Sequence, residues 1–274
     1  MIENAKLTEL VIGIKGAGEM ASGVAWRLYR ANFCRLFMLE LANPLAVRRE
    51  VSFCEAIHDD TKTVEGVAAV KANNIMEIRD SWEAGRIAVI EDPAWKAIDE
   101  LKPDVVIDAI LAKQNLGTSK AEAPLVIGLG PGFTAGEDVH FVIETNRGHH
   151  LGRIFTSHHA EPNTGIPGII GGFTEERVLR APADGTFIAR KSIGDALKKD
   201  EIIGSVEGED VRSKIDGILR GLIRSRSRVS KGLKIGDIDP RGDAGYCYTI
   251  SEKARAIGGS VLEAIMRVYN VAPG

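Results

Sequence analysis

Short apolar runs alternate with helical patterns along roughly the first 112 residues of the chain. The runs are rich in valine and isoleucine, which is typical of buried strands, and they span residues 10–14, 36–39, 87–90, 105–109 and, further on, 125–128. Apolar positions at helical spacing predict helices over residues 20–31, 44–52 and 95–101. Strands and helices that alternate in this way predict a parallel sheet.

The first of these strands leads directly into a glycine-rich turn. The pattern Gly-x-Gly-x-x-Ala that begins at Gly16 is typical of a dinucleotide-binding β-α-β unit, because glycine lets the backbone approach a pyrophosphate at the start of the helix. Glu40 ends the next apolar run, where an acidic residue would bind a ribose 2′-OH. We therefore predict a Rossmann-like domain whose cofactor-binding residues are Gly16, Ala17, Gly18, Glu19, Met20 and Glu40. The alternative is a turn that binds nothing.

A stretch dense in glycine and histidine follows the predicted sheet, and it contains no long helical pattern. Long loops of this kind are more often functional than accidental. Backbone N–H groups of a glycine turn and nearby cations can together bind an anion. The candidate cofactor-binding residues in and beside this stretch are Lys113, Asn115, Gly130, Gly132, Arg147 and His149. The alternative is that the glycines only form tight turns between strands.

Five of the six histidines lie between residues 140 and 159, which raises the question of a metal site. Their spacing matches neither a helical i, i+4 pair nor a Cys/His ribbon, so we predict no metal site formed by the protein alone. The roles of His158, His159 and Cys54 stay open.

An internal repeat with an offset of 32 residues begins near residue 179. It places Asp184-Gly185 on Asp216-Gly217 and Leu197 on Val229. Two matching halves of short strands predict a small β domain, and the pattern resembles the biotinyl/lipoyl type of barrel-sandwich hybrid. The hairpin expected between the halves, residues 207–212, contains no lysine, which argues against a swinging-arm role. A terminal helix is expected over residues 251–269.

These patterns predict an α/β plus β protein in four sections. They are a Rossmann-like nucleotide-binding domain with a parallel sheet (1–128), a Gly/His-rich segment that completes the site (129–178), a barrel-sandwich hybrid domain (179–240) and a C-terminal helical segment (241–274).

Composition narrows the choice of partners. A net charge of −3 gives no reason to expect nucleic acid or an anionic membrane surface as a partner. No apolar run reaches the ~20 residues of a spanning helix, and the first residues lack the pattern of a signal peptide. The three cysteines are far apart and do not form a disulfide framework. We expect a cytoplasmic protein.

Several motifs, in the same order over nearly the whole chain, resemble the YqeB family. They are GIKGAGEMASG at 13–23, ELANPLAVRR at 40–49, VEGV at 64–67, DAILAKQNLGT at 108–118, GPGFTAG at 130–136 and IETNRGH at 143–149. The histidine pair at 158–159 departs from the small residue expected there. The resemblance implies an accessory protein for the maturation of selenium-dependent molybdenum hydroxylases, similar in spirit to the XdhC-type maturation factors.

Three functions follow as hypotheses. The first is a maturation factor that binds a nucleotide-bearing cofactor, NAD(P) or a molybdopterin-type nucleotide, and assists selenium, sulfur or molybdopterin delivery. Its partners would be the molybdenum hydroxylase and other maturation proteins. The second is an NAD(P)-dependent oxidoreductase, and the third is a non-catalytic scaffold that docks a partner enzyme. The sequence identifies no catalytic residue, and it leaves open whether the protein is an enzyme.

Overall fold

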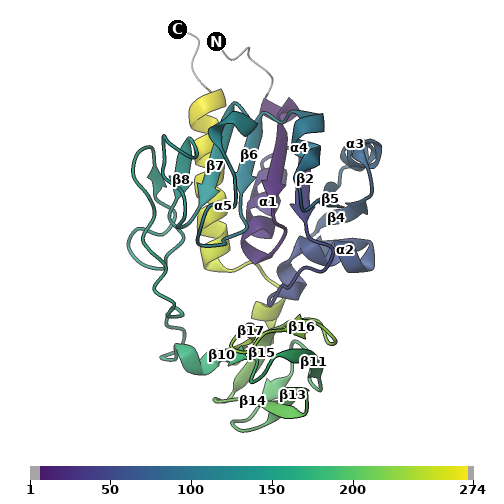
Figure 1. Cartoon of the computed structure of the whole chain (residues 1–274), viewed down its shortest axis with the longest axis vertical. Helices are drawn as coiled ribbons and strands as arrows, with labels where there is room; N and C mark the ends of the chain where they lie inside the picture. The colour runs from purple at the N-terminus through teal and green to yellow at the C-terminus, as the bar shows by residue number, and fades with distance from the viewer. Residues whose placement is uncertain (1–6, 271–274) are drawn as a thin grey trace. The chain divides into compact units, whose positions relative to one another are not determined.

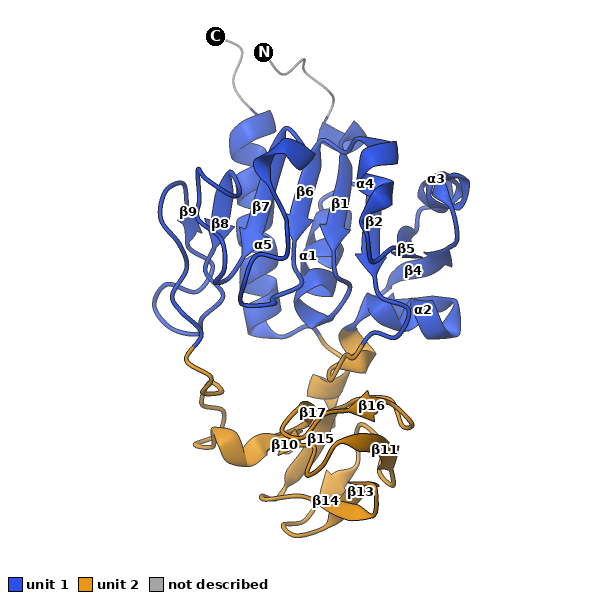
Figure 2. Ribbon diagram, viewed as in Figure 1, with its two compact units in different colours: residues 1–44, 52–163, 250–274 blue, residues 45–51, 164–249 orange. Residues whose placement is uncertain are grey.

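The computed structural model describes residues 7–270, and the chain divides into two units (Figure 2). Unit 1 comprises residues 1–44, 52–163 and 250–274, and unit 2 comprises residues 45–51 and 164–249. The predicted sections 129–178 and 241–274 are therefore each divided between the two units.

Unit 1 is built on one sheet of nine strands (Figure 1). In spatial order the strands are β3 (Thr61–Val64), β4 (Val67–Ala72), β5 (Ile87–Glu91), β2 (Arg35–Glu40), β1 (Val11–Lys15), β6 (Val105–Asp108), β7 (Leu125–Leu129), β8 (Phe141–Ile143) and β9 (Ile154–Phe155). The helices are α1 (Glu19–Arg30), α2 (Ala56–Asp59), α3 (Ile75–Glu83), α4 (Lys96–Leu101) and α5 (Glu252–Tyr269), with short 3₁₀ turns η1 (Leu7–Glu9), η3 (Phe53–Glu55) and η4 (Lys120–Glu122).

The predicted Rossmann-like parallel sheet is wrong for unit 1, because the sheet is mixed. The edge strands β3 and β9 pair antiparallel with β4 and β8. In the doubly wound dinucleotide fold the strands lie in the order 3-2-1-4-5-6, whereas here β5 lies between β4 and β2. The β3–β4 hairpin arises at Glu65 and Gly66, which both have positive φ (41° and 79°), as a tight two-residue turn requires.

The apolar runs nevertheless locate most of the central strands. The predicted strands at 36–39, 87–90, 105–109 and 125–128 each overlap an observed strand. The helix predicted over 44–52 is wrong, because only the 3₁₀ turn η2 (Arg49–Val51) forms there. Helix α3 was not predicted, although Asn74 caps it: the Asn74 side chain accepts a hydrogen bond from the N–H of Glu77.

Helices α1 and α5 lie side by side against the sheet (Figure 1). Small residues let their backbones approach each other. A Cβ on Gly23 would lie 2.7 Å from Cβ of Ala254, and a Cβ on Gly258 would lie 2.9 Å from the carbonyl oxygen of Gly23. The last helix of the chain, close to the predicted 251–269, is thus an integral part of unit 1.

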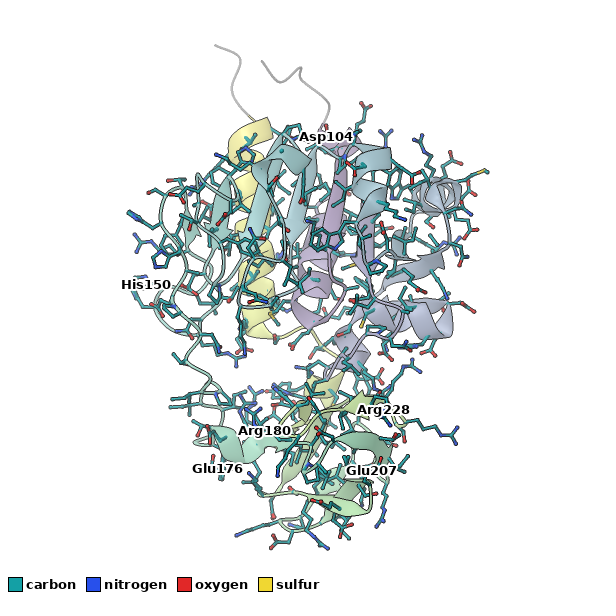
Figure 3. The ribbon with its side chains drawn as sticks, viewed as in Figure 1. Asp104, His150, Glu176, Arg180, Glu207 and Arg228 are labelled. Atoms are coloured by element: carbon teal, nitrogen blue, oxygen red, sulfur yellow. The ribbon has the colours of Figure 1, made fainter. Side chains whose placement is uncertain are left out.

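Asp104 lies at the amino-end edge of the unit 1 sheet (Figure 3), where it contacts both strand β1 and helix α5. Its Oδ2 accepts a hydrogen bond from the N–H of Val11 (2.8 Å), and its carbonyl oxygen accepts one from the hydroxyl of Tyr269 (2.8 Å). Burial, with the nearby Asp104 charge, raises the pKa of Tyr269 to about 12.

Unit 2 contains two antiparallel sheets of four strands each. One has the order β10 (Val178–Arg180), β17 (Lys234–Asp239), β15 (Gly217–Leu222) and β12 (Ala196–Leu197), and the other has the order β14 (Glu209–Arg212), β13 (Ile202–Val206), β11 (Gly185–Ala189) and β16 (Arg228–Val229). The unit also contains the 3₁₀ turns η5 (Glu175–Arg177) and η6 (Ala244–Cys247). The predicted biotinyl/lipoyl-like barrel-sandwich hybrid over 179–240 is wrong, since unit 2 is this pair of antiparallel sheets. Its bounds also differ from the prediction, because unit 2 comprises residues 45–51 and 164–249.

The predicted repeat is confirmed within unit 2. Gly185 and Gly217 both have positive φ (147° and 157°), and they pair with Val229 and Leu197, respectively. The preceding aspartates exchange equivalent contacts between the halves. Oδ1 of Asp184 accepts from the N–H of Lys231 (2.7 Å), and Oδ1 of Asp216 accepts from the N–H of Lys199 (2.8 Å). Each half therefore closes a turn of the other.

Candidate functional site

The glycine-rich turn connects the carboxyl end of β1 to α1. Gly16 has φ 88°, a conformation that favours glycine, and its N–H donates to the carbonyl of Leu39 (2.8 Å). Gly18 is the N-cap residue of α1 and has an ordinary φ of −70°. A Cβ built on Gly18 would have no atom within 4 Å. There is thus open space in front of the amino end of a 12-residue helix, where the partial positive charge of the helix attracts anions.

Glu40 contacts this turn, as its place at the end of β2 predicts. Its Oε2 accepts a hydrogen bond from the N–H of Ala17 (2.8 Å), and its Oε1 accepts from the N–H of Leu41 (2.9 Å). Burial raises the pKa of Glu40 in spite of these two donors. Each carboxylate oxygen keeps a lone pair for a further donor such as a hydroxyl group.

The carbonyl of Ala17 fixes the turn from the other side. It accepts from the N–H of Cys54 (2.9 Å) and from the hydroxyl of Ser22 (3.0 Å), and the same hydroxyl accepts from the N–H of Phe53 (2.7 Å). Cys54 is only 1% exposed. Its observed contribution is therefore to hold the glycine turn in place, and its thiol is not accessible.

The turn that contains Gly130 and Gly132 approaches the segment after β6. A Cβ on Gly132 would lie 2.7 Å from Cα of Gln114, and a Cβ on Gly130 would lie 2.6 Å from Oγ1 of Thr145. Both glycines have positive φ (78° and 111°). The structure thus joins this turn to the 111–115 segment and to the end of β8, as the sequence predicts for neighbouring strands.

The four predicted polar side chains have different surroundings. Oδ1 of Asn115 accepts from the N–H groups of Gly117 and Thr118 (2.9 and 2.8 Å), so Asn115 shapes its own turn. Lys113 is exposed. Two others lie after β8: Arg147 pairs with Glu252 (2.7 Å), and the ring of exposed His149 meets that of His150 edge-on. That these side chains converge on one ligand stays a prediction.

A buried lysine, which the sequence motifs did not predict as a site residue, lies beside the glycine turn. Lys15 is fully buried, and its ammonium group donates to Oγ1 of Thr118 (2.7 Å) and to Oε1 of Glu122 (2.9 Å). It lies 3.5 Å from the ring centroid of Trp95. The hydroxyl of Thr118 in turn donates to Oδ2 of Asp108 (2.6 Å). Burial lowers the pKa of Lys15, against the opposing effect of Glu122 and Asp108.

A signal for this cluster was present in the sequence. Lys15 and Asp108 are charged residues at the ends of otherwise apolar runs, and the structure makes them register partners on the neighbouring strands β1 and β6. Opposite charges that end two apolar strands indicate a shared polar site at that edge of a sheet.

The histidines form no metal site among residues 7–270, since no group of three or more metal-ligating side chains occurs there. His158 and His159 are exposed, and the carbonyl of His158 accepts from the N–H of Ala135 (2.8 Å). Nδ1 of His140 accepts from the N–H of Val126 (2.9 Å), and burial lowers the pKa of His140.

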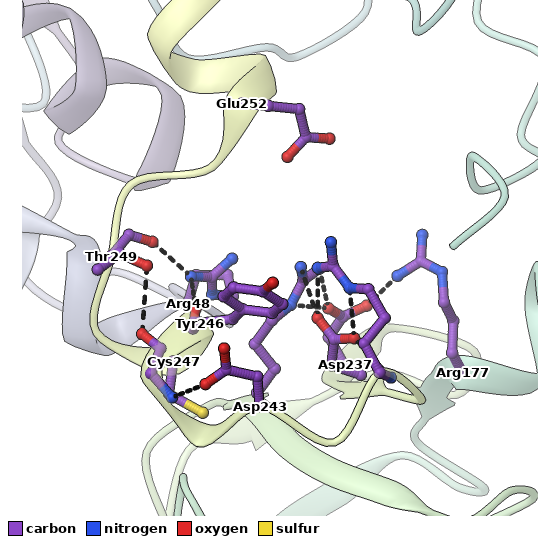
Figure 4. A network of polar contacts seen from close by, with 12 residues as sticks. Arg48, Arg177, Asp237, Asp243, Tyr246, Cys247, Thr249 and Glu252 are labelled. Atoms are coloured by element: carbon purple, nitrogen blue, oxygen red, sulfur yellow. Dashed lines mark hydrogen bonds and ion pairs between the residues drawn. The ribbon is translucent and has the colours of Figure 1, made fainter. Parts of the chain in front are cut away.

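Unit 2 has its own buried charges, on strands β15 and β17 (Figure 4). Asp237 and Asp239 are each 1% exposed. Arg220 donates to both of them, through Nε to Asp237 (2.8 Å) and through Nη1 to Asp239 (3.2 Å), and Arg177 also pairs with Asp237. Arg241 donates to Asp239 through Nε (2.9 Å) and Nη2 (2.6 Å).

Comparison with known proteins identifies one curated relative of high similarity. No protein-family model matches the chain. A protein of Escherichia coli (strain K12) named "Uncharacterized protein YqeB" is 50% identical over 262 residues, which is 96% of this chain. This relative supports the resemblance to the YqeB family. The alignment covers 48% of the relative, so the chain spans about half the length of the curated relative it matches.

Solved structures are similar only at a distance. An aspartoacylase family protein from Mesorhizobium loti is 12% identical, with a TM-score of 0.24, over 74% of this chain and 56% of that chain. A succinylglutamatedesuccinylase/aspartoacylase from Rhodobacter sphaeroides is 14% identical, with a TM-score of 0.23, over 52% of this chain and 60% of that chain. TM-scores this low carry no argument about fold or chemistry. In the part of the chain that the structure describes, no helix is long and apolar enough to span a bilayer.

Proposed function

We propose that unit 1 binds a nucleotide-bearing anionic ligand over the turn Gly16–Gly18, and that the protein is an accessory factor in molybdenum hydroxylase maturation. One observation carries the binding proposal: Gly18 leaves open space at the amino end of α1, at the carboxyl edge of the sheet. Ligands of open α/β sheets bind at this edge.

The residues present fit such a ligand. The first turn of a helix has backbone N–H groups without intrahelical partners, which suit phosphate oxygens. The Glu40 carboxylate is held at the same turn and can accept a bond from a ribose hydroxyl. A ribose 2′-phosphate would be repelled by this carboxylate when it is ionised. NAD and a molybdopterin-type nucleotide both offer phosphate oxygens together with a free ribose hydroxyl, whereas NADP carries the 2′-phosphate.

The role in maturation rests on the resemblance to the YqeB family. It implies a molybdenum hydroxylase and other maturation proteins as partners, and delivery of selenium, sulfur or the molybdopterin cofactor as the task. Cys34, Cys54 and Cys247, which all lie within residues 7–270, form no disulfide, and Cys34 is exposed, which suits a reducing compartment such as the cytoplasm.

Anaerobic purification followed by mass spectrometry of the co-purifying small molecules tests the proposal. A pterin nucleotide supports the maturation factor, and NAD(P) supports the alternative of an oxidoreductase. A protein that carries no nucleotide, and binds none of ADP, NAD⁺ or CDP in calorimetry, supports the non-catalytic scaffold and contradicts ligand binding.

The variant Gly18→Val separates ligand binding from folding. Because the added side chain meets no protein atom within 4 Å of its Cβ, we expect a folded protein that binds nucleotide at least tenfold more weakly. Gly23→Val is the contrasting variant, since its Cβ would collide with Ala254 and disturb the α1–α5 contact. Unchanged nucleotide affinity in Gly18→Val would show that the turn is only structural.

A further inference from the structure

The buried cluster of Lys15, Trp95, Asp108, Thr118 and Glu122, here named the Lys15 clamp, lies directly beside the glycine turn. Its residues come from the end of β1, the loop before α4, the end of β6 and the region of η4. Since Lys15 is fully buried, it does not itself touch a ligand. Its partners nevertheless lie in the segment that follows β6.

We propose that Lys15 is a positioning residue for the ligand site: its contacts to Thr118 and Glu122 hold segment 109–119 against the glycine turn. The part of this inference that concerns affinity rests on the proposed function. The ligand would be the same anionic nucleotide, and Lys113 and Asn115 are the residues of the segment that Lys15 positions for it.

The geometry links the two elements directly. Lys15 is covalently next to Gly16, so one residue joins the glycine turn to the clamp. Gly16 also approaches the segment, because a Cβ at Gly16 would lie 3.4 Å from the carbonyl oxygen of Ala109 and 3.4 Å from Cα of Ile110. A shift of the segment would therefore alter the space over the turn.

The backbone of segment 109–119 is strained, so contacts with the surrounding residues must stabilise its conformation. Leu111 and Lys113 have φ of 60° and 66°, in the left-handed region that is unfavourable for a residue with a side chain. Such conformations persist only where the surroundings determine them, and they gather at functional sites. The clamp supports the segment at Thr118, and the close approach of Gly132 to Gln114 supports its middle.

Stability alone does not explain a lysine at this position. Burying an ammonium group is costly, and replacing a buried ion pair by neutral groups of similar volume is often neutral or stabilising. A methionine would fill the same space in the apolar strand β1. A charged residue here is therefore better explained by the definite geometry that its hydrogen bonds impose on the segment.

The double variant Lys15→Met/Glu122→Gln tests the proposal by removing both charges of the pair, while Asp108 keeps its hydrogen bonds from the Thr118 hydroxyl and the N–H of Ile110. Lys113 is exposed, so trypsin cleavage after Lys113 reports on the segment in the absence of any ligand. We expect a similar unfolding temperature, cleavage at least tenfold faster, and affinity for ADP or NAD⁺ at least tenfold weaker. Peptide-resolved deuterium exchange should rise in 109–119.

The matched control is Arg255→Met/Glu65→Gln, which removes another ion pair of unit 1 (2.7 Å). Cleavage after Lys113 should not change in this control. Thr118→Val is a milder second variant that leaves the Lys15–Glu122 pair in place. We expect cleavage about threefold faster in it, because it loses both clamp hydrogen bonds of the Thr118 hydroxyl.

The proposal is overturned if the folded variant Lys15→Met/Glu122→Gln is cleaved and exchanges deuterium at the same rates as the wild type. If the double variant does not fold, the same comparison is made with Thr118→Val. Failure of the wild type to bind any nucleotide is a different result. It would contradict the proposed function and leave the cleavage test of the clamp intact.

Discussion

The two units bury their charges in different kinds of places. In unit 1, Lys15 and Asp108 lie at the ends of parallel strands, where the chain leaves the sheet for a loop. In unit 2, Arg220, Asp237 and Asp239 lie within a pair of hydrogen-bonded strands. The charge of Lys15 reaches side chains beyond the sheet, at Thr118 and Glu122, whereas the charges of unit 2 join residues of the same strand pair.

A β-bulge explains the arrangement in unit 2. Leu219 pairs with Ile238 and Gly221 pairs with Asp237, so Arg220 is the extra residue of β15. A bulge turns the extra side chain away from its regular direction and increases the local twist. Arg220 can therefore reach both carboxylates of β17. Burial alone would raise the pKa of Asp237, but the positive charges of Lys234, Arg220 and Arg177 outweigh it, so the pKa is lowered.

The largest effect that we expect comes from Asp237→Ala. Removing one member of a buried ion pair typically costs about 3–5 kcal/mol, because the other charge stays buried. We expect unit 2 to lose stability on this scale in urea unfolding. Asp237→Asn, which keeps the shape, is the control for packing. A loss below about 1 kcal/mol in Asp237→Ala would mean that these charges do not hold the ladder together.

The repeat allows a comparison of two equivalent glycines. A Cβ on Gly217 would lie 2.5 Å from the carbonyl oxygen of Asp239, which is backbone, whereas a Cβ on Gly185 meets only the flexible side chain of Glu207. Gly217→Ala should therefore cost about 2–4 kcal/mol, from the unfavourable φ and the collision together.

Gly185→Ala should cost less, about 1–2 kcal/mol, from the unfavourable φ and from displacement of the Glu207 side chain, whose Oε1 accepts from the N–H of Thr186. The two unfolding free energies, measured on the whole chain, check the difference. Equal losses would show that the two halves of the repeat are equivalent in stability as well as in register.

Acid should weaken the buried network of unit 2 more gently than mutation does. The folded pKa of Asp237 lies below its ordinary value of 3.8, so the unfolded chain takes up the proton first as pH falls. The stabilisation is therefore complete above pH 3.8 and is lost as the pH falls from there through the folded pKa. Urea midpoints between about pH 5 and 3 should fall less steeply in Asp237→Asn than in the wild type.

The smallest effect should come from an exposed pair in unit 1. Arg147 pairs with Glu252, but both side chains are partly exposed (27% and 66%). Such surface pairs contribute about 0–1 kcal/mol, so Arg147→Ala should leave the unfolding free energy nearly unchanged. Weaker nucleotide binding in this variant would then assign Arg147 to the ligand site, and an unchanged affinity would remove it from the site.

The sequence located the elements whose signal is local. Apolar runs predict β1, β2 and β5–β7, and a fixed offset predicts the two halves of unit 2, with Gly185 and Gly217 at equivalent turns. The glycine turn and Glu40 lie together, as their places at the ends of β1 and β2 imply.

What the sequence did not show depends on partners distant along the chain. The order of β4, β5 and β2, which makes the Rossmann-like prediction wrong, is decided by how helices and strands pack and not by any single run. Lys15 donates a hydrogen bond to Thr118, which lies 103 positions further along the chain. A single lysine in an apolar run does not indicate which distant residue will accept that hydrogen bond. Sequence distance, and not weak local propensity, limited the prediction of the site.

The late position of α5 has a consequence for synthesis on the ribosome. Helix α5 cannot cover the face of α1 around Gly23 until Ala254 and Gly258 have been translated. Every residue of unit 2 is translated before them. At the usual 5–20 residues per second, this interval is on the order of 10–45 s. During that time the small-residue face of α1 lacks its partner helix, and unit 2 has all of its residues before α5 does.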